Sequence, residues 1–592
     1  MTRYYRNMPR GIAIAGLYIW AMAFTFALSA RGEIIPSSRR LNWAPGIPGG
    51  IPHRTNIFSN VRTGIPGSTN VALGDGRHDD FAAINDAVNL CPSGMVVYLP
   101  AGRYRITQSL YFPYKDHFTL RGDGPGQTVI CGDFTTPSYA LRLGTSEGPP
   151  VPTNRTTAIM SGYGRGSSQI TLVNTNGIGL SVGRFLLINQ SNDNVMVTSI
   201  STSEGVPCTY ADSRRNGTRN LQQVVRITGI NGKQVTFDPP LYWSYNAALK
   251  PEATVLIYTV QGAGIESLTI ENITNTSYCV YLSHADQCWM QDVETDRAWN
   301  YHIFMYFSVQ SEIRDCRFHS SNQPEKSYGF EARFSTALLF ENNIVDDVMA
   351  PFQLNSGSDG CVVGYNYITH IRNLDPTMGK VTMNGCHGAH PMFNLFEGNI
   401  APRFQSDSYW GSCSHLTLFR NHFLGTDDDV THNRIAISID RNCWYHNVVG
   451  NVLGTDGLAW TYEKNSDSFP YTLNVIYRFG YPNMGNNVCN ETNALWYDNH
   501  DPQVRATLLR HGNYDSATGA VVWDPSITDT NIPDSLYLAA KPGWWGNLRW
   551  PPIGPDINPK IGLIPAKKRY EAIMGEIVAP APPGNVRVGI GF

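Results

Sequence analysis

A short pattern of apolar and polar positions recurs through the second half of the chain. Each copy has an apolar pair, two or three polar residues that often include Asn, and a single apolar residue, as in "FNLFEGNI" and "LTLFRNHF". The closing apolar residues are Ile273, Val293, Phe318, Ile344, Ile368, Ile400, Phe423 and Val452, at successive intervals of 20, 25, 26, 24, 32, 23 and 29 residues. Short strands at a period of this length predict a parallel solenoid whose coils stack on one another.

The alternation inside each copy sends one side chain into the interior of the solenoid and the next one outward. Asn suits the turns because it tolerates left-handed backbone conformations, and its amide can stack on the next coil. The longest interval, from Ile368 to Ile400, predicts a loop inserted on one face. Beyond Val452 the pattern fades, and "ATLLRHGNY" is expected to form one last coil that ends at Tyr514.

A different pattern precedes the repeats. Gly74 opens "GDGRHDDFAAINDAVNLCPSGMVVYLPAGRYRI", in which Asp79 or Asp80 can N-cap a short amphipathic helix that carries Phe81, and a strand follows at 96–99. The block resembles the N-terminal signature of the pectate-lyase-like superfamily, which includes enzymes of the pectate lyase 3 type, glycoside hydrolases and phage tailspikes. The resemblance implies an all-β fold, a right-handed parallel β-helix with an N-terminal helical cap, and it leaves the chemistry open.

Changes in composition divide the chain into segments. Arginines, an apolar run and small residues up to Ala30 are typical of a secretory signal peptide, with an uncleaved membrane anchor as the alternative. The predicted segments are a signal peptide (1–30), an extended arm (31–66), the β-helix (67–530) with an insert-like β region (144–261), a C-terminal aromatic strap (531–578) and a Pro-rich flexible tail (579–592). We therefore expect a protein that is secreted or displayed at the cell surface and is free of the membrane after signal cleavage.

Charge and cysteine content narrow the function classes. The formal net charge is -3 and only 16% of residues are charged, which gives no sign of a nucleic-acid partner. Cys361, Cys386, Cys413 and Cys443 are separated by 25, 27 and 30 residues, and the chain contains no CxxC pair that would support a zinc ribbon. Disulfides and a column of buried free cysteines on successive coils are both compatible with this spacing.

Candidate chemistry concentrates in two adjacent stretches, "HGAHPMFNLFEGN" and "SDSYWGSCSHLTLFRN". Outward side chains of successive coils align into a groove that a linear polysaccharide can follow. Because stacked coils lie only ~4.8 Å apart, residues one coil apart in sequence can share that groove. The predicted catalytic residues, expected to converge there, are His390, Asp407, Tyr409, His415 and Arg420. The predicted substrate-binding residues are His387, Glu397, Arg403 and Trp410, and no metal ligands are assigned.

Three chemistries fit these residue types. In β-elimination on a uronate, His390 or His415 would be the base, Arg403 or Arg420 would neutralise the carboxylate, and Tyr409 would donate to the leaving oxygen. In hydrolysis, two carboxylates would flank the glycosidic bond; the candidates are Asp346, Asp347, Glu397 and Asp407. Metal-assisted hydrolysis by His387, His390, Asp407 and His415 is the third option.

The preferred interpretation is a carbohydrate-active protein that cleaves an extracellular, acidic polysaccharide, with lyase chemistry ahead of hydrolysis. Ca²⁺ is the candidate cofactor, although the Asp-rich calcium cluster of pectate lyases is not recognisable here. The alternative is a non-catalytic surface or appendage protein that binds glycans or self-assembles, in which Trp410 and the histidines only support the scaffold. Oligomeric assembly is compatible with either interpretation.

Overall fold

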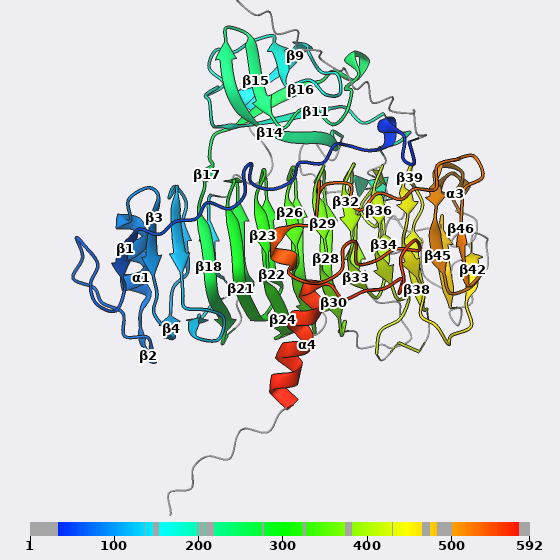
Figure 1. Cartoon of the computed structure of the whole chain (residues 1–592). Helices are drawn as coiled ribbons and strands as arrows, with labels where there is room; N and C mark the ends of the chain where they lie inside the picture. The colour runs from blue at the N-terminus through cyan, green and yellow to red at the C-terminus, as the bar shows by residue number, and fades with distance from the viewer. Residues whose placement is uncertain are drawn as a thin grey trace, which may run out of the picture.

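The computed structural model describes residues 33–578 except for 137, 146–152, 194, 198–199, 202–205, 208–217, 275–276, 324–326, 373–381, 429, 432, 465–473 and 482–499. Most of this chain forms a long stack of coils, and a small barrel lies on one side of the stack (Figure 1). The predicted signal peptide and tail lie outside the described residues. Within the described residues, no helix has the length and apolar character needed to cross a membrane.

Three faces run along the stack, named here face 1, face 2 and face 3 in the order in which each coil visits them. Faces 1 and 2 form one continuous sheet, in which neighbouring coils pair in parallel. The strands of face 1 are β1 (Ile57–Asn60), β3 (Met95–Tyr98), β6 (Phe118–Arg121), β23 (Glu312–Arg314), β26 (Leu339–Glu341), β29 (Val362–Gly364), β32 (Leu395–Glu397), β36 (Thr417–Phe419), β40 (Asn447–Val449) and β44 (Leu509–His511). The strands of face 2 are β2 (Asp75–Asp79), β4 (Gly102–Ile106), β7 (Thr128–Gly132), β24 (Arg317–Ser321), β27 (Ile344–Asp346), β30 (Tyr367–Thr369), β33 (Ile400–Ala401), β37 (His422–Phe423), β41 (Val452–Leu453) and β45 (Asn513–Asp515).

Two long strands, β18 (Gly264–Asn272) and β21 (Trp289–Ala298), run through both of these faces, and β46 (Ala520–Val522) pairs with β45 in the antiparallel sense. Face 3 is a second parallel sheet. Its strands are β5 (Leu110–Phe112), β8 (Tyr139–Leu143), β19 (Tyr278–Ser283), β22 (Tyr301–Tyr306), β25 (Tyr328–Arg333), β28 (Ala350–Asn355), β31 (Met383–Asn384), β34 (Phe404–Ser406), β38 (Ile435–Ile439), β43 (Val475–Phe479) and β42 (Thr461–Lys464). The predicted all-β parallel β-helix is therefore confirmed.

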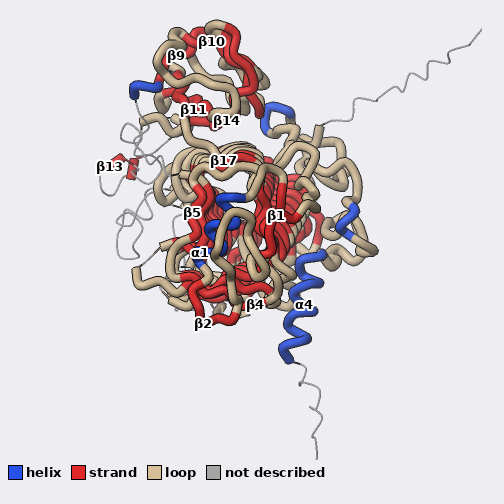
Figure 2. Tube along the Cα trace, turned by 90° about the vertical axis from the view of Figure 1, so that its left-hand side faces the viewer, coloured by secondary structure: helices blue, strands red, loops and turns tan. Residues whose placement is uncertain are grey.

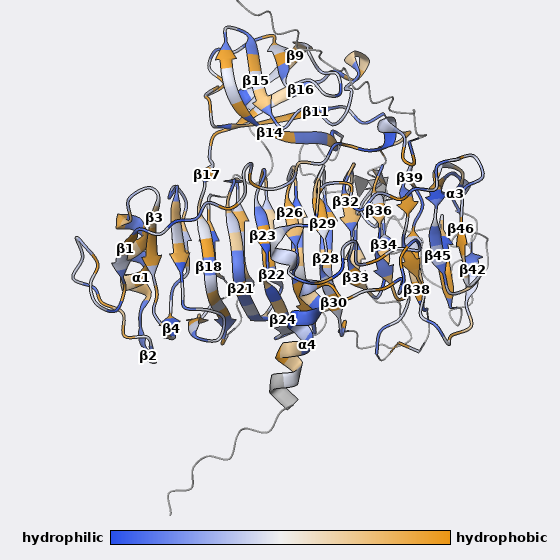
Figure 3. Cartoon of the chain, in the orientation of Figure 1, coloured by the Kyte–Doolittle hydropathy of each residue, from blue (hydrophilic) through white to orange (hydrophobic). Residues whose placement is uncertain are grey.

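The interior of the stack follows the predicted alternation. On face 3, Val280, Ile303, Phe330 and Phe352 occupy the same register position in successive coils and are buried in the main core. Phe330 and Phe352 stack with ring centroids 5.2 Å apart, an arrangement favoured by aromatic rings in contact. Figure 3 shows apolar positions recurring from strand to strand along the solenoid. Identical positions in successive coils therefore meet the same environment.

An asparagine ladder fixes the turn from face 1 to face 2. In each of several coils the side-chain amide donates to the Oδ1 atom of the equivalent Asn in the next coil, at 2.9–3.1 Å. The ladder comprises Asn343, Asn366, Asn399, Asn421, Asn451 and Asn513. The predicted stacking of amides is confirmed, but the left-handed residue is the one before the ladder Asn, as at Tyr365 (φ 57°) and Gly398 (φ 69°).

The N-terminal opening of the stack is covered by α1 (Phe81–Leu90), which lies across the end of the coils in Figure 2. Asp80 occupies the N-cap position, but its carboxylate accepts hydrogen bonds from the Leu73 and Gly74 amides, at 2.7 and 3.1 Å, instead of capping the helix. The Phe81 amide donates to Asp79 at 3.1 Å. Asp80 therefore holds the preceding loop, which corrects the capping role expected for it.

The small barrel lies within the segment predicted as insert-like. It closes in the order β10, β15, β14, β11, β16, β9. Its strands are β9 (Thr156–Ser161), β10 (Gln169–Leu172), β11 (Phe185–Gln190), β14 (Leu221–Asn231), β15 (Gln234–Asp238) and β16 (Glu252–Leu256). It contacts the turns between face 3 and face 1, where Arg226 pairs with Asp286 at 2.8 Å and the Val224 amide donates to Thr336.

Both terminal segments of the described chain run along the outside of the solenoid, and the last helix, α4 (Pro565–Val578), projects beyond the stack (Figure 1). The N-terminal arm is anchored where the Trp43 indole donates to the Phe393 carbonyl at 2.7 Å. The C-terminal strap follows α3 (Pro502–Thr507) and ends in α4 (Pro565–Val578). Its Trp545 is buried, with its ring centroid 5.0 Å from that of Tyr365. These contacts cover much of face 1.

Candidate functional site

The predicted site residues separate into a group under the strap on face 1 and a group at the end of face 3. Glu397, in the first group, is fully buried and both its oxygens have partners. It accepts from the Tyr365 hydroxyl at 2.6 Å and from the Leu536 amide at 2.8 Å. Burial raises the pKa of Glu397 to about 7. The contacts with the strap assign Glu397 to the attachment of that segment.

Arg420 belongs to the same attachment. Its guanidinium forms a two-pronged ion pair with Asp556 at 2.8 and 2.7 Å and donates to the carbonyls of Ile532, Pro533 and Ile553. Only 1% of Arg420 is exposed, so no substrate carboxylate can reach it. The expected convergence of five catalytic side chains therefore does not occur, because the left-handed turn residue Arg420 points into the strap.

The two histidines predicted as bases are both buried. His390 has no exposed surface and lies between the hydroxyls of Ser412 and Ser414, at 3.1 and 2.9 Å. His415 stacks between Phe393 and Tyr445, with centroid distances of 4.8 and 5.1 Å. Burial lowers the pKa of His390 to about 4 and that of His415 to about 3. Both are packing residues in the turns beyond face 3, which corrects their predicted catalytic role.

Asp407, Tyr409 and His387 come together in the turns that follow β31 and β34. The Nδ1 atom of His387 lies 2.8 Å from Asp407, and the Asn384 amide also donates to Asp407, at 2.7 Å. The rings of His387 and Tyr409 stack with centroids 5.6 Å apart, and Trp410 packs against Tyr409 at 4.8 Å. The side chains of His387 and Asp407 retain 22% and 15% exposure, so this pair reaches solvent.

The charge of Asp407 tunes His387. Burial works against a charged imidazole, but the neighbouring carboxylate outweighs it, and the pKa of His387 is raised above its usual value. A carboxylate can only accept a hydrogen bond, so Nδ1 carries a proton and Nε2 is left to accept or hand over another. An oriented His–Asp pair of this kind is suited to general acid–base catalysis.

A row of outward side chains on face 3 leads to this pair. Its members occupy one register position in successive coils and change from aromatic to polar along the stack. In order, they are Tyr281, Phe304, Glu331, Gln353, Asn384, Gln405, Ser438 and Arg478. Polar side chains on an outward face are usually exposed to solvent. Most polar members of this row are buried instead, and together they form a polar wall beside the His387–Asp407 pair.

Glu331 is the central acid of this wall. Its Oε1 atom accepts from Arg333 at 2.5 Å and from the Asn355 amide at 3.1 Å. Its Oε2 atom is buried without a hydrogen-bond partner. Leaving a buried carboxylate oxygen unsatisfied costs free energy, and such costs concentrate at functional sites.

Cations stand next to the acids at the far end of the wall. Arg478 pairs with Asp440 at 3.1 Å and donates to Ser438 at 2.9 Å. Arg403, predicted as a substrate-binding residue, lies within electrostatic reach of Asp407 and Asp440. Burial and the nearby Arg478 lower the pKa of Arg403 to about 9. This end of face 3 therefore combines a desolvated cation with the His387–Asp407 pair.

The polar wall is not evident from the recurring sequence pattern described above, because that pattern corresponds to the strands of face 1. A second phrase, an apolar residue followed by a polar one, recurs later in each coil, as in "GFEAR", "PFQLN" and "RFQSD". Aligning it places Glu331, Gln353 and Gln405 in one column, as the structure does. For Ca²⁺, the cofactor considered from the sequence, the described residues contain no cluster of carboxylates arranged as ligands.

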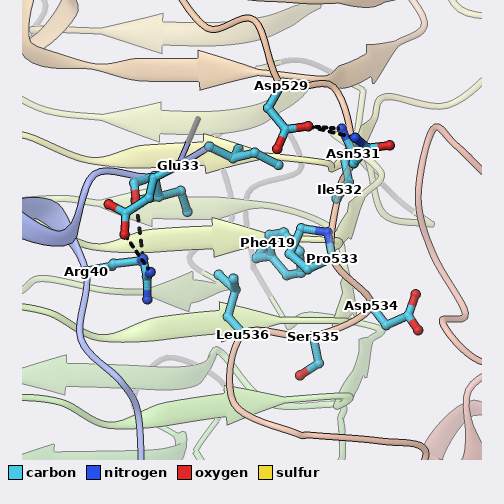
Figure 4. A pocket seen from close by; sticks show the side chains of 12 residues that line it. Glu33, Arg40, Phe419, Asp529, Asn531, Ile532, Pro533, Asp534, Ser535 and Leu536 are labelled. Atoms are coloured by element: carbon cyan, nitrogen blue, oxygen red, sulfur yellow. Dashed lines mark hydrogen bonds and ion pairs between the residues drawn. The ribbon is translucent and has the colours of Figure 1, made fainter. Parts of the chain in front are cut away.

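A separate cavity of about 630 Å³ lies between the arm and the strap (Figure 4). Glu33 and Arg40 pair across one side at 3.3 Å, and Asp529 accepts from Asn531 on the other. Phe419 forms part of its wall. None of the residues predicted from the sequence lines this cavity, and its polar groups bond to one another, so it is the weaker candidate.

Two family models agree with the fold. The family model "Rhamnogalacturonase A/epimerase, pectate lyase-like" matches residues 69–149, and "Right handed beta helix region" matches residues 253–423. No curated protein matches. Solved structures that resemble the chain include the tailspike protein gp49 from Pseudomonas phage LKA1 (14% identity, 69% of this chain and 78% of that chain, TM-score 0.43). The Azotobacter vinelandii mannuronan C-5 epimerase AlgE6 A-module (12%, 75% and 97%, 0.34) and PfbA, a surface adhesin of Streptococcus pneumoniae (12%, 70% and 89%, 0.31), are also similar.

Proposed function

We propose that this chain, a pectate-lyase-like right-handed parallel β-helix, acts outside the cell on an acidic polysaccharide. The proposed reaction abstracts a proton next to a uronate carboxylate and eliminates the leaving oxygen. The observation that carries this proposal is the His387–Asp407 pair at the solvent-reaching edge of a buried, charged wall. Hydrolysis by Glu331 and Asp407 is the competing reaction for the same place.

The roles follow from the contacts. His387 takes the C5 proton through Nε2 while Asp407 holds the ring by Nδ1. As the C5–H bond breaks, a double bond forms between C4 and C5, the C4–O bond breaks, and a proton returns to the leaving oxygen. We assign Tyr409, stacked on His387, as the donor to that oxygen, and Arg403, within electrostatic reach of Asp407, as the charge that offsets the uronate carboxylate.

A product assay on purified protein tests the reaction. Incubation with polygalacturonate, alginate and a neutral glucan is expected to yield unsaturated, ultraviolet-absorbing ends from one of the acidic polymers only. His387→Gln should lower the rate about 100-fold or more. His370→Gln is the matched control, because His370 also pairs with an aspartate, Asp428 at 2.7 Å, but lies on another face. New reducing ends without unsaturated products would replace elimination by hydrolysis.

A second candidate, glycan binding without turnover, is supported by the aromatic half of face 3. Tyr278, Tyr301 and Tyr328 form a continuous stack with centroid distances of 5.1 and 4.7 Å. The faces of these rings contact one another, so a bound glycan would meet a row of half-buried ring edges and hydroxyls. Retained binding of an acidic polymer, with neither unsaturated nor reducing ends formed, would favour this function over catalysis.

A further inference from the structure

Three cysteines meet in the interior beneath the His387–Asp407 pair. The Sγ atoms of Cys386, Cys413 and Cys443 all lie within 4.8 Å of one another, and all three residues are buried. Each comes from a different coil, in the turn that follows β31, β34 and β38 respectively. Cys413 and Cys443 are register partners in the short parallel pair formed by β35 (Cys413–Ser414) and β39 (Cys443–Trp444).

A histidine stands beside one of the three sulfur atoms, although it is not part of the group whose ligand atoms all lie within 4.8 Å of one another. The Nε2 atom of His446 lies 3.7 Å from the Sγ atom of Cys413, and His446 is buried. Its Nδ1 atom lies 3.2 Å from the carbonyl of Trp444, which can only accept, so the proton sits on Nδ1 and the Nε2 lone pair faces the sulfur and the Ser406 hydroxyl. This tautomer is the one that metal-binding histidines adopt when the second nitrogen bonds to a carbonyl.

A nearby backbone carbonyl does not distinguish these cysteines from the others in the solenoid. Cys316 and Cys361 lie 3.2 and 3.7 Å from carbonyls, and Cys386 lies 3.3 Å from the carbonyl of Gly411. What distinguishes the cluster is the meeting of three thiols. Within the described residues, the Cys386, Cys413 and Cys443 cluster is the only group of three His, Cys, Asp or Glu side chains with ligand atoms this close together. A single core thiol needs no special explanation, whereas three thiols with a histidine next to one of them have the composition of a structural zinc site.

We propose that Cys386, Cys413 and Cys443 bind one divalent metal ion that prefers thiolate ligands, such as Zn²⁺, with His446 moving toward the ion as the fourth ligand. In a tetrahedral site with Zn–S bonds of ~2.3 Å the sulfur atoms lie ~3.8 Å apart, and the three Sγ atoms already lie within 4.8 Å of one another. Binding converts three thiols to thiolates and releases three protons to solvent, with no change in oxidation state. The ligands are spaced by one coil each, so no CxxC motif reveals them in the sequence.

The ion would fasten three successive coils where the candidate site is built. Cys386 precedes His387, and the carbonyl of Cys386 accepts from the Asp407 amide at 3.0 Å. The Trp410 amide donates to the carbonyl of His387 at 2.8 Å. The metal site thus supports the turns that hold the His387–Asp407 pair, and it stands independently of the proposed reaction.

Elemental analysis of the full chain, purified without chelator, tests the site. We expect about one zinc per chain in the wild type and at least a tenfold lower content in Cys443→Ser. Cys361→Ser is the matched control, because Cys361 is equally buried in the same core but outside the cluster, and it should keep its zinc. Replacing zinc with Co²⁺ in the wild type should give the strong visible bands and the sulfur-to-cobalt charge-transfer absorption of a tetrahedral thiolate site.

The cobalt spectrum uses the wild-type chain, so the test does not depend on whether Cys443→Ser folds. Three results would overturn the proposal. They are wild-type protein that takes up neither zinc nor cobalt, a disulfide between Cys413 and Cys443 in peptide maps of that protein, and a folded Cys443→Ser variant that retains zinc. His446→Gln should shift the cobalt bands without abolishing the sulfur charge transfer.

Discussion

Face 1 and face 3 both carry buried carboxylates on their outward sides, yet the chain surrounds these acids in different ways. On face 1, Glu341 accepts from the Tyr537 hydroxyl and pairs with Arg314, and Glu397 binds Ser535 and Leu536 of the strap. On face 3, Glu331 bonds instead to Arg333 and Asn355 of its own sheet. A buried oxygen without a partner does not separate the two faces, because Glu312 on face 1 also has one. A buried acid therefore does not identify a site by itself, whereas hydrogen bonds from a covering segment indicate attachment.

The cations show the same contrast. Arg420 on face 1 donates to the strap, whereas Arg403 near face 3 lies within electrostatic reach of Asp407 and Asp440. If this comparison is correct, changes on face 1 should alter stability and leave turnover intact. Changes on face 3 should do the reverse.

The largest expected effect is the loss of stability in Arg420→Ala. This change leaves Asp556 and three carbonyls in the strap without their donor. Asp556 is 35% exposed and can be solvated, so the main cost comes from the buried carbonyls that lose their donor, ~1–3 kcal/mol of the free energy of unfolding for each. Urea unfolding followed by tryptophan fluorescence measures it. Arg103→Ala is the control, since its pair with Glu271 is about half exposed and should cost under ~1 kcal/mol.

A smaller effect is expected in the pH dependence of stability. Burial raises the pKa of Glu397 to about 7 from 4.5, so the folded state holds this proton more tightly than the unfolded state. The contribution of Glu397 to stability is then complete below pH 4.5 and is lost as the pH rises to about 7, by roughly 3 kcal/mol at most. Glu397→Gln should flatten this slope in urea unfolding measured from pH 4 to 8. An unchanged slope would mean that Glu397 is not desolvated under the strap.

The sequence predicts the scaffold far better than the site. The spacing of apolar residues from Ile273 to Val452 reflects a packing requirement that repeats in every coil, so it survives in the printed sequence. The structural role of Arg420 depends on its ion pair with Asp556, which lies 136 residues away in a segment without periodicity. No local pattern could reveal that contact.

The same reasoning explains the half of the site that was found. Asp407 and His387 follow successive strands of face 3, so their proximity is a direct result of stacking. Whether a turn residue such as His390 or His415 points inward depends on the hydroxyls and rings that receive it. Those partners come from neighbouring coils, the arm and the barrel.

On face 3, Asp407→Asn tests how the site histidine is tuned. Removing the carboxylate charge takes away what raises the pKa of His387, so that pKa should fall. If neutral His387 is the base, the rising limb of the pH–rate profile moves to lower pH in the variant. A titration of the His387 ring by NMR reports the same shift in the absence of substrate. A limb that stays in place would assign the base to another group.

The smallest effect is expected from Tyr301→Ala, in the middle of the tyrosine stack on face 3. Its ring lies nearly parallel to that of Tyr278, at 6°, and to that of Tyr328, at 19°. An aromatic contact with a sugar ring contributes ~0.5–1.5 kcal/mol, which corresponds to about two- to twelvefold weaker binding. Calorimetric titration with an oligosaccharide of the preferred polymer measures the change, and Tyr114→Ala, an exposed tyrosine outside the stack, provides the control. Equal affinities for the two variants would mean that the tyrosine stack does not contact the substrate and that recognition occurs at the polar end of face 3.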